Sequence, residues 1–306
     1  MWKYILKRIA ISLATVIVLI TAVFFLVRLM PGDPFSSEKM TPEVKANMEA
    51  YYGFDKPLPV QYAKYIGNLL HGDLGYSMKY SNQTVNDLIK ATFPYSADLG
   101  IRAIVFALSF GLVLGVVAAR NRGKKLDFAC IIIAIIGTSV PDFIMGSLLQ
   151  YTFGVKWGLL PIAQYKGFEY TILPSIAVGF YTLASVSRFM RSSMLDVISQ
   201  DYIKTARSKG ISEFRITWKH QIRNAIMPII TMMGPMVASV LTGTFVIEAM
   251  FVVPGMGKYY VESIQTQDYT VVLGITVFYG IFLVTANMIV DILYGIVDPR
   301  VRLAEK

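Results

Sequence analysis

The stretch DYIKTARSKGISEFRITWKHQIRNAIMPII, residues 201–230, is a basic and amphipathic segment within an apolar chain. The chain is 55% hydrophobic, has a mean hydropathy of +0.53, and carries only 16% charged residues, against about 25% in soluble proteins. Because glycine readily adopts the left-handed conformation that ends helices, Gly210 predicts one helix over residues 200–209. Ser212 is placed to cap a second helix, with Glu213 in its first turn.

The second predicted helix has one apolar face. Ile211, Phe214, Trp218 and Ile222 follow one another at spacings of three, four and four residues, which is the period of an amphipathic helix. Two interpretations follow from this pattern. A basic loop could fix membrane topology and rest on anionic lipid head groups, or the helix could dock in a groove of a cytoplasmic protein.

The rest of the chain is dominated by apolar runs of roughly membrane length. We therefore predict an all-α polytopic membrane protein with six transmembrane helices. The first run is predicted to be a retained helix rather than a signal peptide, because it is long and no small-residue cleavage site follows it. The six predicted spans are Ile9–Leu29, Leu99–Ala119, Phe128–Phe153, Ile172–Val186, Ala225–Phe251 and Val271–Val297.

Lysine and arginine residues are distributed unequally between the two sides of these spans. The N-terminus, the loop 120–127, the segment 187–224 and the C-terminus hold 18, whereas the short loops 154–171 and 252–270 hold three. Since cytoplasmic loops carry the excess of basic residues, both termini and the 201–230 segment are predicted to be cytoplasmic. The net charge of +9 then reflects membrane topology and membrane lipids, not nucleic acid.

The predicted organisation has three parts. Residues 1–29 hold the N-terminus and first span, residues 30–98 form a small helical extracytoplasmic domain, and residues 99–306 form a five-helix core with a cytoplasmic loop at about 190–225. Within the small domain we expect two or three short helices. One would begin after Thr41 and end at Gly53, and another would begin near Pro59 and end at Gly72.

Several chemistries are excluded by the residues themselves. His71 and His220 lie far apart and Cys130 is alone, so no metal-ligand spacing and no internal disulfide exist. No G-x-x-x-x-G-K-[ST] motif occurs, so the chain has no P-loop of its own. No nucleophile–base pair stands out either, and we predict a protein that is not an enzyme and holds neither metal nor cofactor.

Several short sequence motifs in the chain resemble those of one known protein family. KTARSKG followed by IRNAIMP resembles the EAA loop of permease subunits of ABC importers, with Lys204, Thr205, Ala206 and Gly210 at its positions. Lys and Thr replace the usual Glu and Ala, and the gap to Pro228 is longer; both departures resemble the oligopeptide and dipeptide branch. Other stretches resemble the same branch, namely RLMPGDPF, YYGFDKPLPVQYAKYIGNLLHGDLGYS, TSVPDF, VIEAMFVVPGMGKYYVESIQTQDY and NMIVDILYGIVDPRVR.

The resemblance implies a B-type permease subunit in the cytoplasmic membrane of a prokaryote. It implies a second homologous permease, two ATPase subunits that bind ATP and Mg²⁺, and an extracytoplasmic substrate-binding protein. The loop helix would couple the permease to an ATPase. The residues carried over to this contact are Thr205, Ala206 and Gly210 for close backbone approach, Ile211, Phe214 and Trp218 for buried contact, and Arg207 and Lys209 for its charged edge.

Charged or helix-breaking residues within spans are the candidates for the substrate pathway. Pro141 and Asp142 interrupt the third span, either as a simple kink or as a bend that lines the pathway. Glu248 could face the pathway or water. Asp291 lies within a span, where a charge suggests a function, but a structural pairing with Arg300 or Arg302 near the cytoplasmic surface is favoured. The G-x-x-x-G formed by Gly111 and Gly115 predicts close helix packing.

Two alternatives to peptide import stay open at this stage. Nickel and glutathione importers use similar subunits, although the scarcity of histidine is against metal uptake. A self-sufficient channel or secondary transporter is of another class. Such a protein would be expected to carry several ionisable groups inside the membrane and would not need a docking helix.

Overall fold

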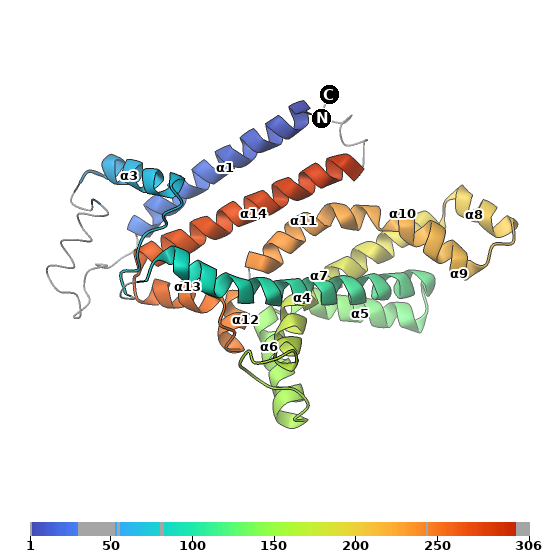
Figure 1. Cartoon of the computed structure of the whole chain (residues 1–306). Helices are drawn as coiled ribbons and strands as arrows, with labels where there is room; N and C mark the ends of the chain where they lie inside the picture. The colour runs from blue at the N-terminus through green and yellow to red at the C-terminus, as the bar shows by residue number, and fades with distance from the viewer. Residues whose placement is uncertain (1, 30–52, 54–55, 80–82, 243, 298–306) are drawn as a thin grey trace. The chain divides into compact units, whose positions relative to one another are not determined.

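The structure is a computed structural model of the chain, and it describes residues 2–29, 53, 56–79, 83–242 and 244–297 (Figure 1). The predicted helix after Thr41, the motif at residues 30–35 and the partners Arg300 and Arg302 lie outside these residues, and the side chain of Asp291 is not described. The described residues form helices and loops, with one isolated antiparallel bridge between Tyr76 and Thr84.

The helices account for most of the described chain. Four of them are long and apolar enough to cross a membrane, namely Ile5–Arg28, Val85–Arg120, Glu169–Ile198 and Tyr269–Ile289, and up to six spans result if two bent helix pairs count as one span each. The elements are α1 (Trp2–Arg28), α3 (Leu58–Leu70), α4 (Val85–Arg120), α5 (Lys125–Ser139), α6 (Asp142–Leu149), the π-helix η1 (Gln150–Lys156), α7 (Glu169–Ile198), α8 (Asp201–Ser208), α9 (Glu213–Ile216), the π-helix η2 (Thr217–Ile222), α10 (Arg223–Ala225), α11 (Met227–Thr242), α12 (Phe245–Met250), α13 (Met256–Gln265) and α14 (Tyr269–Val297).

Several helices differ in extent from the predicted spans. Helix α4 begins at Val85 instead of Leu99 and contains Pro94, and α7 continues to Ile198 beyond the predicted end at Val186. Residues 187–198, which follow the apolar run of α7, contain neither glycine nor proline, so this helix continues past its apolar part. Helix α4 extends through Pro94 in its interior. The fifth run is divided between α11 and α12 instead of forming one helix to Phe251.

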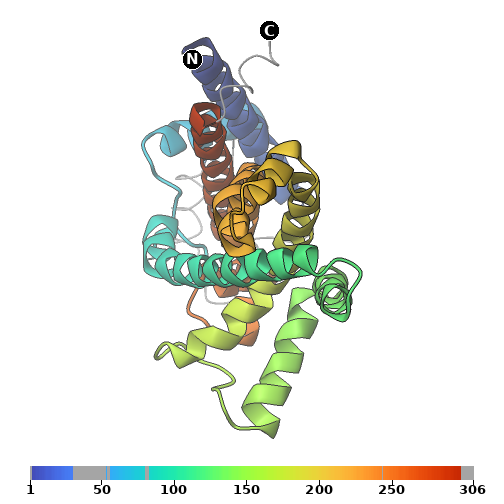
Figure 2. The same ribbon diagram turned by 90° about the vertical axis from the view of Figure 1, so that its right-hand side faces the viewer.

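The bend in the third apolar run is confirmed. The axes of α5 and of the following α6–η1 pair differ by 112°, and Pro141 occupies the N-cap position of α6 (Figures 1 and 2). Proline fixes its own φ and disfavours the helical conformation of the residue before it, which explains why Val140 is extended. The bend therefore places Pro141 and Asp142 at a corner between two helices.

The chain divides into two compact units. Among the described residues, one unit comprises 96–253 and 286–297, and its core is built on α7. Helix α4 packs closely on α7 through the predicted glycine pair. A Cβ at Gly111 would lie 2.8 Å from the carbonyl oxygen of Leu183, and one at Gly115 would lie 2.5 Å from Cβ of Met190. This confirms helix packing as the role of the G-x-x-x-G motif.

The other unit comprises residues 2–95 and 254–285 within the described part of the chain. Its core joins Phe24 of α1 to Val272 and Val277 of α14, with partly buried residues of α3 packed on them. The helix predicted between Pro59 and Gly72 is α3, where Pro59 lies in the first turn and Gly72 follows the end with φ +76°.

A buried carboxylate holds the start of α14 to the 77–79 loop in this second unit. Asp268 is fully buried, and its Oδ2 accepts hydrogen bonds from Ser77 Oγ at 2.5 Å, Met78 N at 3.1 Å and Lys79 N at 3.2 Å. Its Oδ1 accepts a bond from Val271 N at 3.2 Å, in the first turn of the helix. The Asp268 side chain thus accepts hydrogen bonds from three backbone N–H groups.

Replacing Asp268 with alanine is expected to destabilise the chain by about 3 kcal/mol or more, because each unsatisfied buried donor costs about 1–3 kcal/mol. Ser77→Ala removes the bond that Ser77 Oγ donates to Asp268 and the one that it accepts from Lys79 N, and it is expected to cost about 1–2 kcal/mol. The measurement is thermal unfolding of the detergent-purified protein by intrinsic fluorescence. Equal midpoints for the Asp268→Ala variant and the unmodified chain would show that the carboxylate does not hold this loop.

Candidate functional site

The 201–225 segment forms a small folded element of its own. Helix α8 ends at Ser208, and Gly210 follows with φ +72°, as its predicted role as a helix terminator requires. Ile203, Ala206 and Ile216 are buried against one another, and Ile211 packs on them. The two helices α8 and α9 therefore share a hydrophobic contact, so the segment is an ordered structure and not an extended loop.

Two ion pairs lie on the outside of this element. Arg207 Nε lies 2.7 Å from Glu213 Oε1 and joins α8 to α9 across the Gly210 turn, while Lys204 Nζ lies 2.9 Å from Asp201 Oδ1. The hydrogen bond from Lys204 holds the pKa of Asp201 below its ordinary value, and the bond to Glu213 raises the pKa of Arg207. Asp201 and Arg207 are thus both charged at neutral pH.

An aromatic pair projects from the same element. Phe214 is 69% exposed and Trp218 is 61% exposed, and their ring centroids are 6.2 Å apart. Two large neighbouring aromatic side chains on the surface of a folded segment are typical of a binding surface, because each leaves apolar area in water that a partner can cover. We refer to Phe214 and Trp218 as the aromatic pair.

The single apolar face predicted for the second helix is wrong. The chain changes to a π-helix at Thr217, which alters the rotation per residue, so that Thr217 and Gln221 face inward while Trp218 faces outward. Ile211 packs within the segment instead, and Ile222 packs against the α7 core. The predicted face is thus divided between the interior and an exposed part that consists of the aromatic pair.

The remaining predicted coupling residues differ in accessibility. Ala206 is buried within the segment, so it supports α8 from inside and does not present an approach surface. Thr205 is exposed, and its hydroxyl donates to the carbonyl oxygen of Asp201 at 3.0 Å. Lys209 is exposed at the end of α8, and a Cβ placed on Gly210 would meet no atom within 4 Å. The turn at Gly210 is therefore constrained by its φ angle and not by crowding.

An ion pair between a buried carboxylate and a partly exposed arginine anchors α7, which leads into this segment. Arg191 of α7 donates Nε to Asp127 Oδ1 at 2.7 Å and Nη2 to Asp127 Oδ2 at 2.9 Å, and the backbone N of Gly123 donates to the same carboxylate. The Asp127 side chain is 4% exposed. This bidentate pair fixes the start of α5 and the loop before it to α7, about three helical turns before α8 begins.

Replacing Arg191 with alanine is expected to destabilise the chain by about 3 kcal/mol or more, because it leaves a buried carboxylate without its counter-charge. Replacing both Arg191 and Asp127 with alanine is expected to recover part of that loss, which a double-mutant cycle of thermal unfolding measures. Arg188→Ala, one turn away on α7 at an exposed position, is the matched control and should leave the midpoint unchanged. Additive losses in the cycle would contradict a direct interaction.

The predicted pathway residues Pro141 and Asp142 line a cavity of about 340 Å³. Helix α7 contributes Tyr181 and Thr182 to its wall, and α11 contributes Ser239. A second cavity of about 480 Å³ shares Thr138 and Tyr181 with the first and continues along α7 past Ser185, Arg188, Phe189 and Ser192. The bend at Pro141 thus opens onto a polar groove along a helix long and apolar enough to span a membrane.

Glu248, the third predicted pathway residue, lies elsewhere. It is fully buried in α12, and the Thr244 hydroxyl donates to its Oε1 at 2.5 Å. It is not among the described residues that line the two cavities. The structure therefore brings Pro141 and Asp142 together with polar residues of α7, which sequence reasoning did not single out, and separates Glu248 from them.

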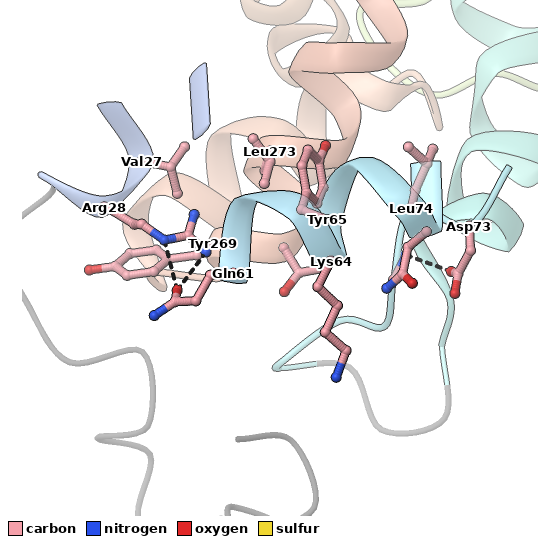
Figure 3. A pocket seen from close by; sticks show the side chains of 12 residues that line it. Val27, Arg28, Gln61, Lys64, Tyr65, Asp73, Leu74, Tyr269 and Leu273 are labelled. Atoms are coloured by element: carbon pink, nitrogen blue, oxygen red, sulfur yellow. Dashed lines mark hydrogen bonds between the residues drawn. The ribbon is translucent and has the colours of Figure 1, made fainter. Parts of the chain in front are cut away.

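A third, much smaller pocket of about 40 Å³ lies where α1, α3 and α14 meet (Figure 3). Arg28 donates Nε and Nη2 to Gln61 Oε1 at 3.1 and 3.0 Å and lies over the Phe24 ring, while Gln61 Nε2 donates to the carbonyl oxygen of Lys56. This space has room for a few water molecules, since each needs about 10–15 Å³ in this measure. These contacts tie α3 to the end of α1.

No group of three or more His, Cys, Asp or Glu residues able to hold a metal ion occurs among the residues that the structure describes. The candidate functional surfaces of this part of the chain are the exposed aromatic pair and the polar groove along α7.

The fold is that of a multi-pass α-helical membrane protein, with an exposed aromatic pair and a polar groove along α7. The family described as "Binding-protein-dependent transport system inner membrane component" matches residues 111–303, and the family that describes the N-terminal part of such components matches residues 1–100. The chain belongs to this family of inner-membrane transport components.

Named relatives cover the full length of the chain. It is 46% identical over 307 residues to the dipeptide transport system permease protein DppB of Bacillus subtilis, with 100% of both chains covered. It is 42% identical to the oligopeptide transport system permease protein OppB of Haemophilus influenzae, covering 99% of this chain and 100% of the relative. A solved structure of an amino acid ABC transporter with histidines has the same fold, with a TM-score of 0.54 and 14% identity over 68% of this chain and 94% of that one.

Proposed function

We propose that the chain is a permease subunit of an ATP-driven importer of dipeptides or oligopeptides. Similarity over the full length to permeases named for those substrates carries the proposal. The exposed aromatic pair and the polar groove supply the two surfaces that such a subunit needs, one for a motor protein and one for substrate.

The proposed assembly contains a second homologous permease, two ATPase subunits and an extracytoplasmic substrate-binding protein. ATP and Mg²⁺ would bind to the ATPase subunits, since this chain has no P-loop. The element formed by α8 and α9 would dock on an ATPase through Phe214 and Trp218, with Arg207 and Lys209 at the edge of the contact. Gly210 sets the angle between the two helices, so movement of the ATPase would be transmitted to α7.

The proposed topology has six spans, with the two bent helix pairs each crossing once and both termini in the cytoplasm. This arrangement places the α8–α9 element on the side of the membrane where ATP is available, and it leaves residues 30–98 outside as a small domain facing the binding protein. The excess of Lys and Arg in the loops of the α8–α9 side supports this orientation.

Reconstitution tests the proposal directly. The chain is placed in liposomes with its partner permease, ATPases and binding protein, and uptake of labelled di- and tripeptides is measured with and without ATP. We expect ATP-dependent peptide uptake that unlabelled peptide competes with and that neither nickel nor glutathione reduces. Uptake of nickel or glutathione instead of peptide would contradict peptide as the proposed substrate. Uptake driven by an ion gradient without ATP would contradict the proposal of an ATP-driven importer.

A further inference from the structure

The polar groove follows a regular spacing of residues in the sequence of α7. Tyr181, Ser185, Arg188 and Ser192 are spaced by four, three and four residues, which places them on one face of a helix, and all four line the two cavities. Tyr181, Arg188 and Ser192 are exposed on the chain. Because an exposed polar face on a membrane-spanning helix is costly in lipid, this face belongs against water, substrate or protein.

Arg188 is distinctive within this face. It is the one cationic side chain among the described residues lining the two cavities, and no ion pair or side-chain hydrogen bond of Arg188 occurs in the part of the chain that the structure describes. Arg191, one turn further along, is fully engaged with Asp127. The guanidinium of Arg188 therefore has its donors available, and a planar carboxylate is the group that such donors bind best.

The opposite charge lies at the other end of the groove. Asp142 lines the first cavity together with Tyr181, and Arg188 lines the second. Tyr181 and Arg188 are about 10 Å apart along the helix axis, at a rise of about 1.5 Å per residue. A peptide of three residues in extended form spans about the same length, at roughly 3.3–3.6 Å per residue, and it carries an amino group at one end and a carboxylate at the other.

On the basis of the proposed function, we propose that Arg188 binds the C-terminal carboxylate of the transported peptide, with its amino terminus directed toward Asp142. The groove then selects peptides by their free C-terminus, while Ser185 and Ser192 offer hydroxyl groups to the peptide backbone. This assignment requires no particular side chain in the substrate, because both charges belong to the ends of every unmodified peptide.

The test compares a tripeptide with a free C-terminus and the same tripeptide as its C-terminal amide in the reconstituted complex. The binding protein is saturated with each peptide, which a separate titration verifies, so that the comparison reports the permease. In the unmodified complex we expect uptake of the free acid to exceed that of the amide by about tenfold or more, the range for a hydrogen-bonded charge pair.

Arg188→Gln is expected to lower uptake of the free acid to the level of the amide, to leave amide uptake unchanged, and to retain stimulation of ATP hydrolysis by the loaded binding protein. Arg188→Lys should restore part of the preference. Lys125→Gln, which removes a positive charge at the exposed start of α5, is the control and should behave as the unmodified chain does.

Three outcomes would overturn the assignment of Arg188. These are equal uptake of acid and amide by the unmodified complex, an unchanged preference in Arg188→Gln, and an equal fall for both peptides in that variant, which would indicate a structural role. Failure of the proposed function is distinguishable from all of them, because the unmodified complex would then take up neither peptide.

Discussion

Replacing Phe214 and Trp218 together with alanine is expected to release the ATPase subunits from the complex while the chain itself stays folded. The two rings are 69% and 61% exposed, so their removal takes almost no packing away from the interior. In the proposed complex with the ATPase they would be the central aromatic anchors of the interface. Truncation of such anchors costs about 2–4 kcal/mol, which corresponds to a loss of affinity of roughly 30- to 1,000-fold.

The measurement is the amount of ATPase retained when the tagged chain is purified from membranes in mild detergent. The matched control is Trp157→Ala with Phe168→Ala, which removes the same two residue types at similar exposure, 53% and 68%, from the 154–171 loop predicted to lie outside the cell. The control should retain the ATPases. Full retention in the Phe214/Trp218 variant would show that the aromatic pair is not the docking surface.

Replacing Gly210 with valine is expected to separate ATP hydrolysis from uptake, lowering uptake by about tenfold or more while the complex still assembles. Gly210 has φ +72°, and a Cβ added to it would meet no atom within 4 Å, so valine would fit but would disfavour this backbone conformation. A left-handed conformation costs an L-residue about 1–2 kcal/mol. The turn would relax, and the angle at which α9 meets its partner would change.

Uptake and ATP hydrolysis are measured on the same reconstituted sample, and their ratio reports coupling. Gly158→Val is the matched control, since Gly158 has φ +61° and equally open surroundings but lies in the loop before α7. Gly210→Asn is expected to keep most of the coupling, because asparagine tolerates the left-handed region. Normal uptake in Gly210→Val would mean that the geometry of this turn does not matter for transport.

The features that the sequence predicted correctly are those with a local signal. Gly210 ends α8, Pro141 bends the third apolar run, and Gly72 ends α3, because glycine and proline permit or restrict backbone conformations wherever they occur. The G-x-x-x-G motif indicated close helix packing for a similar reason. Hydropathy also indicated that the chain spans a membrane. The structure has four single helices and two bent helix pairs that are long and apolar enough to cross it, which gives four to six spans and not a fixed six.

The features that sequence reasoning missed depend on contacts between distant residues. No sequence pattern near Asp127 indicates that it will bind Arg191, 64 positions later. The π-helix that begins at Thr217 likewise has no characteristic residue composition. The polar face of α7 did have a signal, the spacing of Tyr181, Ser185, Arg188 and Ser192. Hydropathy hides this signal because the apolar run ends at Val186, so Arg188 and Ser192 fall outside the predicted span although the helix continues through them.

The most direct test of an ATP-driven importer is to identify what the intact chain binds. The tagged protein is purified from native membranes in a mild detergent, and the proteins that accompany it are identified by mass spectrometry. We expect a homologous permease, one or two P-loop ATPases and a substrate-binding protein. Recovery of the chain alone or as a homo-oligomer, with no ATPase in any detergent, would contradict an ATP-driven importer and leave the 201–230 segment as a basic membrane loop.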